Sequence, residues 1–110
     1  MSTTDSGRNA ESRVADYLKK QGWKILSKNW RNRWCEIDIV AKHDNKVYFV
    51  EVKYRAQNEW GDGFEAITTT KLKRLARAAD AWVMLNNWSG EYQLVAVKVT
   101  DDEIDLRYID

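Results

Sequence analysis

Apolar residues recur along this chain with helical spacing in two segments. In the first, about residues 8–21, Val14 and Leu18 lie on one helix face, and Gly22 follows where a glycine would end a helix. The second predicted helix covers about residues 69–86 and has a continuous apolar stripe. That stripe consists of Leu72, Leu75, Ala76, Ala79 and Val83.

Between and after the helices, short segments are rich in β-branched and aromatic residues, which is typical of strands. The predicted strands span about residues 23–31, 34–41, 46–54, 91–100 and 103–109. Residues 42–45 are predicted to be the turn of a hairpin, and residues 57–66 a loop. The order αβββαββ predicts an α/β fold in which helices flank a mixed sheet. One domain is expected over residues 1–110, with residues 1–6 frayed.

The composition limits the chemistry available to this chain. It has 110 residues, of which 44% are apolar and 32% charged, with one cysteine (Cys35) and one histidine (His43). A disulfide within the chain, a multi-cysteine zinc site and a histidine-based triad are therefore excluded. No segment resembles a membrane span or a signal peptide, so we expect a cytoplasmic protein without a membrane partner. Carboxylates, lysines and hydroxyls remain as candidate catalytic groups.

Three carboxylates occupy positions at which the pattern predicts apolar residues. Glu11 shares a face with the apolar residues of the first predicted helix. Asp38 interrupts an apolar strand of the kind found at the centre of a sheet. Glu51 and Lys53 are two residues apart at the end of the next strand, so they project from one face. Burying carboxylates costs several kcal/mol each, so such a group needs compensation.

The predicted hairpin would bring Asp38 and Glu51 to similar heights on neighbouring strands. Two carboxylates, a backbone carbonyl near Val52 and waters would suit a hard cation such as Mg²⁺, with Mn²⁺ as a substitute. Beside that ion, Lys53 would suit hydrolysis of a phosphodiester. The alternative is that each acid is a solvated charge at the end of an element.

Basic residues gather in segments, although the net charge is only +1. Such segments suit phosphate binding, or else form an ordinary solvated face. The candidate nucleic-acid-binding residues are Arg31, Arg33, Arg55, Lys71, Lys73, Arg74 and Arg77. Of the six tryptophans, Trp60 lies in the glycine-containing loop and is the best candidate for stacking on a base, whereas core packing explains the others.

Asp38, the segment Glu51-Val52-Lys53 and an upstream helical glutamate resemble the PD-(D/E)XK nuclease superfamily, which has the restriction-endonuclease-like fold. More closely, the chain is similar to the YraN-like family of small bacterial proteins, which are distantly related to archaeal Holliday-junction resolvases. The principal matching segments are residues 7–11, 17–22, 36–41 and 47–55. Two departures are Cys35, where the family usually has glycine, and Gly63, in a loop where the family often has proline.

The resemblance implies a metal-dependent endonuclease that hydrolyses DNA, with branched DNA as one candidate substrate and a homodimer as one candidate assembly. It implies that Asp38 and Glu51 are metal ligands, Lys53 the catalytic lysine and Glu11 an auxiliary acid. The alternative is a non-catalytic module on the same fold that binds nucleic acid or a protein partner. Fold alone does not decide between the two.

Overall fold

The computed structural model describes residues 3–33, 36–55 and 69–109, with side chains from residue 9 onward. Its elements follow the predicted order αβββαββ. They are α1 (Thr3–Lys20), β1 (Lys24–Arg31), β2 (Glu36–His43), β3 (Lys46–Tyr54), α2 (Thr69–Leu85), β4 (Glu91–Val99) and β5 (Ile104–Ile109). The predicted α/β fold with a mixed sheet is confirmed.

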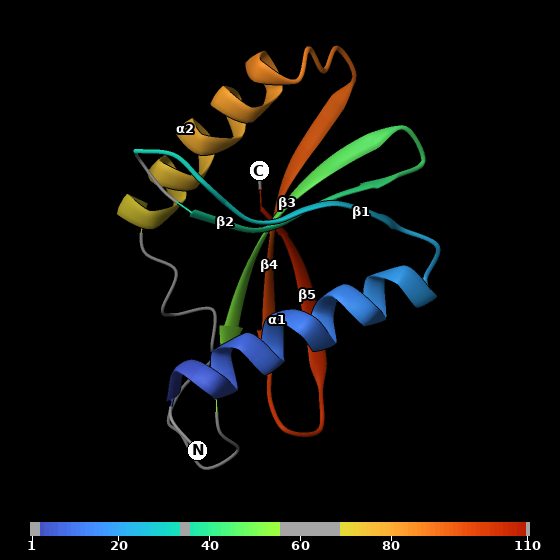
Figure 1. Ribbon diagram of the computed structural model, residues 1–110, viewed down its shortest axis with the longest axis vertical. Helices are drawn as coiled ribbons and strands as arrows, with labels where there is room; N and C mark the ends of the chain where they lie inside the picture. Colours follow the sequence, from blue (N-terminus) through green and yellow to red (C-terminus); the bar gives the residue numbers. More distant parts are fainter. Residues whose placement is uncertain (1–2, 34–35, 56–68, 110) are drawn as a thin grey trace.

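The five strands form one sheet in the order β1-β2-β3-β4-β5 (Figure 1). Neighbouring strands are antiparallel except for β3 and β4, which are parallel. Parallel neighbours need a crossover connection, and α2 lies in the connection between these two strands. The parallel pair therefore forms the centre of the sheet, and the antiparallel strands form its flanks.

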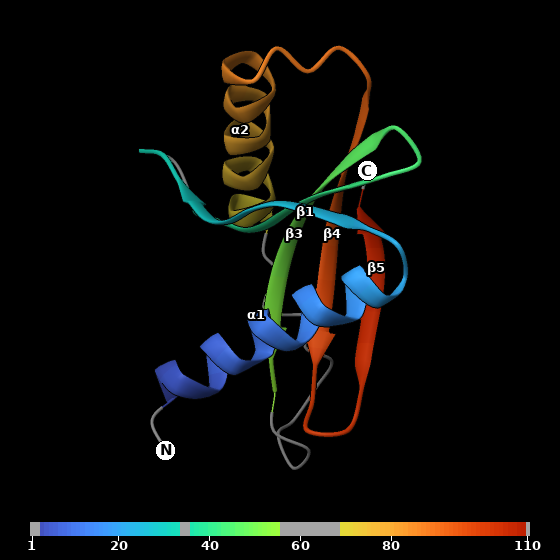
Figure 2. The same ribbon diagram turned by 45° about the vertical axis from the view of Figure 1, so that its right-hand side comes forward.

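The helices lie on opposite faces of the sheet, so the core has two layers (Figures 1 and 2). We call the layer under α1 the α1 core; its buried residues include Val14, Leu18, Ile39, Val50, Val95 and Val97. The layer under α2 is the α2 core; its buried residues include Ile37, Val40, Phe49, Leu75, Trp82 and Leu94. Burial of these side chains on both faces explains why the central strands are apolar almost throughout.

α1 begins at Thr3, about five residues earlier than predicted, while the expectation of a frayed segment over residues 1–6 stays a prediction. The first residues contain no proline, and the unfavourable helix propensities of Thr3, Thr4, Asp5 and Ser6 amount to only tenths of a kcal/mol each. The other end is as predicted: Gly22 has a φ of 91°. Its N–H donates to Lys19 O at 3.0 Å, and Trp23 N–H donates to Leu18 O at 2.9 Å, which is a Schellman cap. Neither described helix is both long and apolar enough to cross a membrane.

The β2–β3 hairpin turns through two residues, Asp44 and Asn45. Their φ angles are 50° and 63°, and two residues in the left-handed region are typical of a type I′ turn. The pairing of His43 with Lys46 across this turn sets the hairpin register. That register determines which residues of β2 and β3 meet at the other end of the hairpin.

Candidate active site

The predicted acids gather where β2 and β3 separate. Pairing between these strands reaches Ile39 and Val50, and continuing the register by one step places Asp38 opposite Glu51. Beyond that point β2 pairs only with β1, and β3 continues beside β4 as far as Tyr54 (Figures 1 and 2). The hairpin thus brings together the two predicted metal ligands at the split between the strands.

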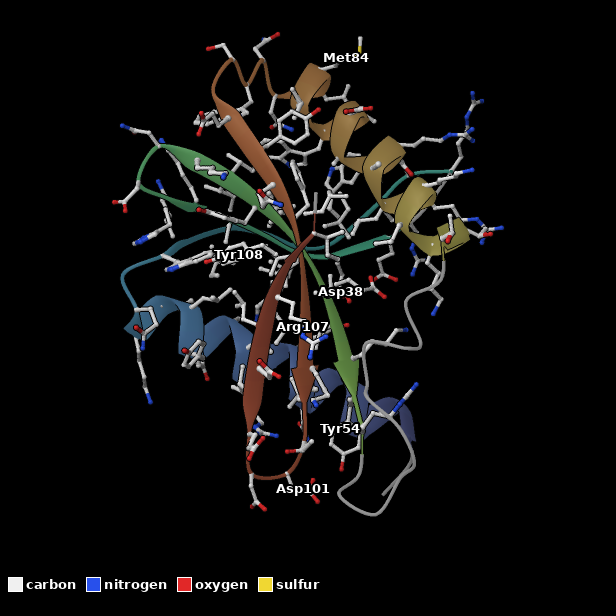
Figure 3. The ribbon with its side chains drawn as sticks, turned by 180° about the vertical axis from the view of Figure 1, so that it is seen from behind. Asp38, Tyr54, Met84, Asp101, Arg107 and Tyr108 are labelled. Atoms are coloured by element: carbon white, nitrogen blue, oxygen red, sulfur yellow. The ribbon has the colours of Figure 1, made fainter. Side chains whose placement is uncertain are left out.

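Asp38 is held at this split by the backbone of β3. The N–H of Val52 donates to Asp38 Oδ2 at 2.7 Å, in place of the backbone pairing that ends here. Figure 3, viewed from the side opposite α1, shows Asp38 at this level of the sheet. Burial, followed by repulsion from Glu51, raises the pKa of Asp38 to about 8, although the Val52 hydrogen bond opposes this shift. Nearby positive charge therefore does not offset the cost of burying the charged form of Asp38.

Glu11 approaches the same site from α1. Three buried residues spaced four apart, Ala10, Val14 and Leu18, anchor this part of α1 in the α1 core. Glu11 is half-buried, and burial, then repulsion from Glu36, raises its pKa, while a hydrogen bond with Asp38 opposes the shift. The inward placement predicted for Glu11 is confirmed.

Asn29 joins the carboxylates from the β1 side and was not predicted. With its amide oriented to satisfy its hydrogen bonds, Nδ2 donates to Glu11 Oε2 at 2.8 Å and to Glu36 Oε1 at 2.9 Å. Glu36 in turn pairs with Arg31, whose Nη2 lies 3.1 Å from Glu36 Oε2. One amide and one guanidinium thus compensate part of the negative charge around Asp38.

The backbone at Asn29 also departs from regular strand geometry. Asn29 lies opposite Asp38 in the β1–β2 ladder, and its φ of 52° is in the left-handed region. In β2, Ile39 packs in the α1 core, but Ile37 and Val40 both pack in the α2 core, so side-chain alternation breaks at Asp38. Asparagine tolerates this φ better than most residues, which is the one sequence signal that could have identified the position.

Glu51 and Lys53 lie on the α2 side of the sheet, beyond Phe49 on the same face of β3. Lys53 Nζ is 3.4 Å from Glu51 Oε1, and the two side chains are 24% and 17% exposed. Burial opposes the charge on Lys53, but a hydrogen bond with Lys71 and the attraction of Glu51 outweigh it and raise the pKa of Lys53. The prediction that Lys53 stays charged is therefore supported.

Lys71 is the predicted phosphate ligand that the structure brings to this site. It lies in the first turn of α2, and its hydrogen bond with Lys53 lowers its pKa, as does burial. The other candidates have different surroundings. Arg31 pairs with Glu36, Arg55 donates to the carbonyl of Tyr54, and the rest are exposed. These remaining candidates are Arg33 next to β1 and Lys73, Arg74 and Arg77 on α2. Trp60, Cys35 and Gly63 lie outside the described residues.

The carboxylates of Asp38 and Glu51 fit a magnesium ion better than a metal ion that needs all of its ligands from the protein. Within residues 3–33, 36–55 and 69–109, no three Asp, Glu, His or Cys side chains are arranged to hold one ion together. Mg²⁺ is usually bound by one or two carboxylates and keeps several waters, so two carboxylates such as Asp38 and Glu51 would be enough to hold one. Val52 contacts Asp38 through its N–H, whereas the expected carbonyl ligand near Val52 stays a prediction.

The α/β fold with a mixed sheet is compatible with the restriction-endonuclease-like class. The acids and one lysine meet where two strands of this sheet separate. Comparison with known proteins gives the family. The model of uncharacterised protein family UPF0102 matches residues 10–106, so the chain belongs to the UPF0102 family, the YraN family of the sequence analysis.

Relatives in this family align with nearly the whole chain. A UPF0102 protein of Cytophaga hutchinsonii is 34% identical over 110 residues, which is 100% of this chain and 97% of the relative. One from Sulfurihydrogenibium is 38% identical over 101 residues, 89% of this chain and 88% of the relative. One from Mycolicibacterium vanbaalenii is 34% identical over 108 residues, 98% of this chain and 88% of the relative. The resemblance to the YraN-like family is confirmed by these matches.

Proposed function

We propose that this protein is a Mg²⁺-dependent endonuclease that hydrolyses DNA phosphodiesters, with branched DNA among its substrates. The observation that carries the proposal is the meeting of Asp38, Glu51 and Lys53 where β2 and β3 separate. Two carboxylates, with a charged lysine next to one of them, match the two needs of the reaction. Those needs are a binding site for a metal cation and a fixed positive charge near the phosphorus.

The metal would polarise a phosphoryl oxygen and lower the pKa of bound water. Asp38 and Glu51 would hold it, with the Val52 N–H fixing the orientation of Asp38. Lys53 would stabilise the negative charge that develops on the phosphoryl oxygens, because its raised pKa keeps it protonated at neutral pH. Glu11, whose pKa is raised, would act as the auxiliary acid through a hydrogen bond with Asp38.

A second candidate is a non-catalytic module that binds nucleic acid or a protein partner. The exposed basic residues of α2 favour it, because Lys73, Arg74 and Arg77 could contact a phosphate backbone without any metal. In such a module the acids would lower the affinity for phosphate, so replacing Glu51 by Gln would leave binding unchanged or improve it.

The two candidates are separated by one gel experiment. Labelled single-stranded, duplex and four-way-junction DNA would each be incubated with Mg²⁺, with Mn²⁺ and with EDTA. Wild type, Lys53→Ala and the control Lys24→Ala would be compared, because Lys24 is an exposed lysine at the far end of β1. We expect metal-dependent cleavage that Lys53→Ala loses and Lys24→Ala retains. Binding without cleavage in either metal would support the non-catalytic module instead.

A further inference from the structure

The sheet carries charged residues next to the candidate site, on the same face. Leu94 of β4 and Ile109 of β5 belong to the α2 core, whereas Leu106 packs on the α1 core. Because side chains alternate along a strand, Lys98 and Arg107 project to the α2 side. This is also the side of Glu51 and Lys53.

The register arranges these residues in two rows across the strands. Glu51 pairs with Ala96, which pairs with Arg107. One step further along, Lys53 pairs with Lys98, which pairs with Asp105. Adjacent strands are about 4.8 Å apart, so the backbone of Arg107 is roughly 10 Å from that of Glu51, a distance that a guanidinium side chain shortens.

α2 covers only the other half of this face. Its buried residues, Leu75, Ala78, Ala79 and Trp82, pack with Phe49 and Leu94, which precede the charged rows along β3 and β4. Figure 3 shows the Arg107 side chain in front of the strands on the side away from α1, between the levels of Asp38 and Tyr54. Among the described residues, no helix packs over Lys98 and Arg107, and Arg107 is exposed.

The charge on this half-face is mostly positive. Lys53, Lys98 and Arg107 face Glu51 and Asp105 across the two rows. A metal ion bound at the candidate site would neutralise Glu51. Asp105 would then be the one carboxylate of the two rows whose charge is not neutralised in this way. A line of cations that begins at Lys53 and continues over β4 and β5 suits a polyanion with regularly spaced charges.

We infer that the half-face formed by Lys98 and Arg107 is a binding surface for the phosphate backbone of the substrate strand, leading from Lys53 across β4 to β5. This inference rests on the proposed function, since it names the path of the same substrate. Lys98 and Arg107 lie far along the sequence from the other basic candidates, and only the sheet register connects them to the site. The competing explanation is a set of cross-strand ion pairs, Lys98 with Asp105 above all, that stabilises the sheet alone.

The test measures DNA binding without cleavage. Binding of a fluorescein-labelled oligonucleotide, as single strand, duplex and four-way junction, would be followed by anisotropy in EDTA at several salt concentrations. Wild type would be compared with Lys98→Glu, Arg107→Glu and the control Lys24→Glu, which makes the same charge change at an exposed lysine of β1. Lys98→Gln and Arg107→Gln would show whether milder changes act in the same direction, and urea unfolding would check that each variant is folded.

We expect Lys98→Glu and Arg107→Glu to weaken binding at least tenfold. Each should also lower the slope of log K against log salt by about 0.7–0.9, the loss of one phosphate contact. The control should change neither quantity. If the two variants bind as the control does, or lose only unfolding stability, the inference is overturned while the proposed function stands. If wild type binds none of the three DNA forms, the inference is overturned too, and metal-dependent cleavage decides the proposed function separately.

Discussion

The backbone N–H of Val52 donates to the Asp38 carboxylate at 2.7 Å, so β3 holds an acid of β2 where the two strands stop pairing. A strand split normally leaves backbone groups to be satisfied by water or by side chains. Here a side chain takes the place of the next ladder bond. The same hydrogen bond both closes the ladder and fixes one oxygen of the carboxylate next to Glu51 along the chain.

Asp38→Asn is expected to stabilise the metal-free protein increasingly as the pH rises. The folded protein holds the Asp38 proton up to about pH 8, while the ordinary pKa is 3.8. Between these values the folded state binds more protons than the unfolded state, so wild-type stability falls as the pH rises. The variant keeps an acceptor for Val52 but has no charge to bury. The free energy of unfolding, measured with urea in EDTA, should be higher for the variant than for wild type. This difference should grow by at least about 1.4 kcal/mol between pH 5 and pH 9, the equivalent of one pKa unit. A constant difference between the two proteins at all pH values would contradict this.

Mg²⁺ is expected to raise the melting temperature of wild type but not of Asp38→Asn or Glu51→Gln. An ion that binds only the folded protein stabilises it, by about 2.7 kcal/mol at one hundred times its dissociation constant. Asp16→Asn is the matched control, because Asp16 is an exposed acid on the outer side of α1. Differential scanning fluorimetry across a Mg²⁺ titration measures the shift. Equal shifts in all four proteins would mean that these two carboxylates do not hold the ion.

Asn29→Ala is expected to destabilise the protein by about 2–3 kcal/mol and Asn29→Gly by about 1 kcal/mol less. Both variants lose the hydrogen bonds to Glu11 and Glu36, but only alanine is strained at a φ of 52°. The same two substitutions at Asn45, which has a φ of 63° in the hairpin turn, measure the backbone contribution separately. Urea unfolding at one pH gives all four values. If Asn29→Gly were as costly as Asn29→Ala, the left-handed backbone would not be the reason for asparagine here.

Lys71→Ala is expected to reduce metal-dependent cleavage about tenfold, equivalent to about 1.4 kcal/mol of transition-state stabilisation. Lys71 shares a hydrogen bond with Lys53 that raises the pKa of Lys53 and lowers its own, so Lys71 would help to hold the charged Lys53 where the scissile phosphate would lie. Lys73→Ala is the comparison on the same helix, since Lys73 is exposed and two residues away. Single-turnover rates at saturating enzyme separate this effect from weaker binding. A larger loss for Lys73→Ala would place the substrate elsewhere on α2.

Local patterns determined the elements and their order in this protein. Apolar periodicity identified both helices, and the alternation of Glu51 and Lys53 placed them on one face of β3, because these are properties of neighbouring residues. The start of α1 was missed because polar residues near a helix end are nearly neutral in propensity. Acids at apolar positions marked Glu11, Asp38 and Glu51, since burying a charge without a role is costly.

Only the tertiary structure decided which distant residues join these acids. Asn29 reaches Glu11 and Glu36 because the β1–β2 register places it opposite Asp38, and Lys71 reaches Lys53 because α2 packs on that side of the sheet. Lys98 and Arg107 share a face with Lys53 only through pairing across β4 and β5. Sequence periodicity fixes the face of an element to which a side chain belongs. Strand order and register, which depend on contacts between segments far apart in the chain, determine which faces meet.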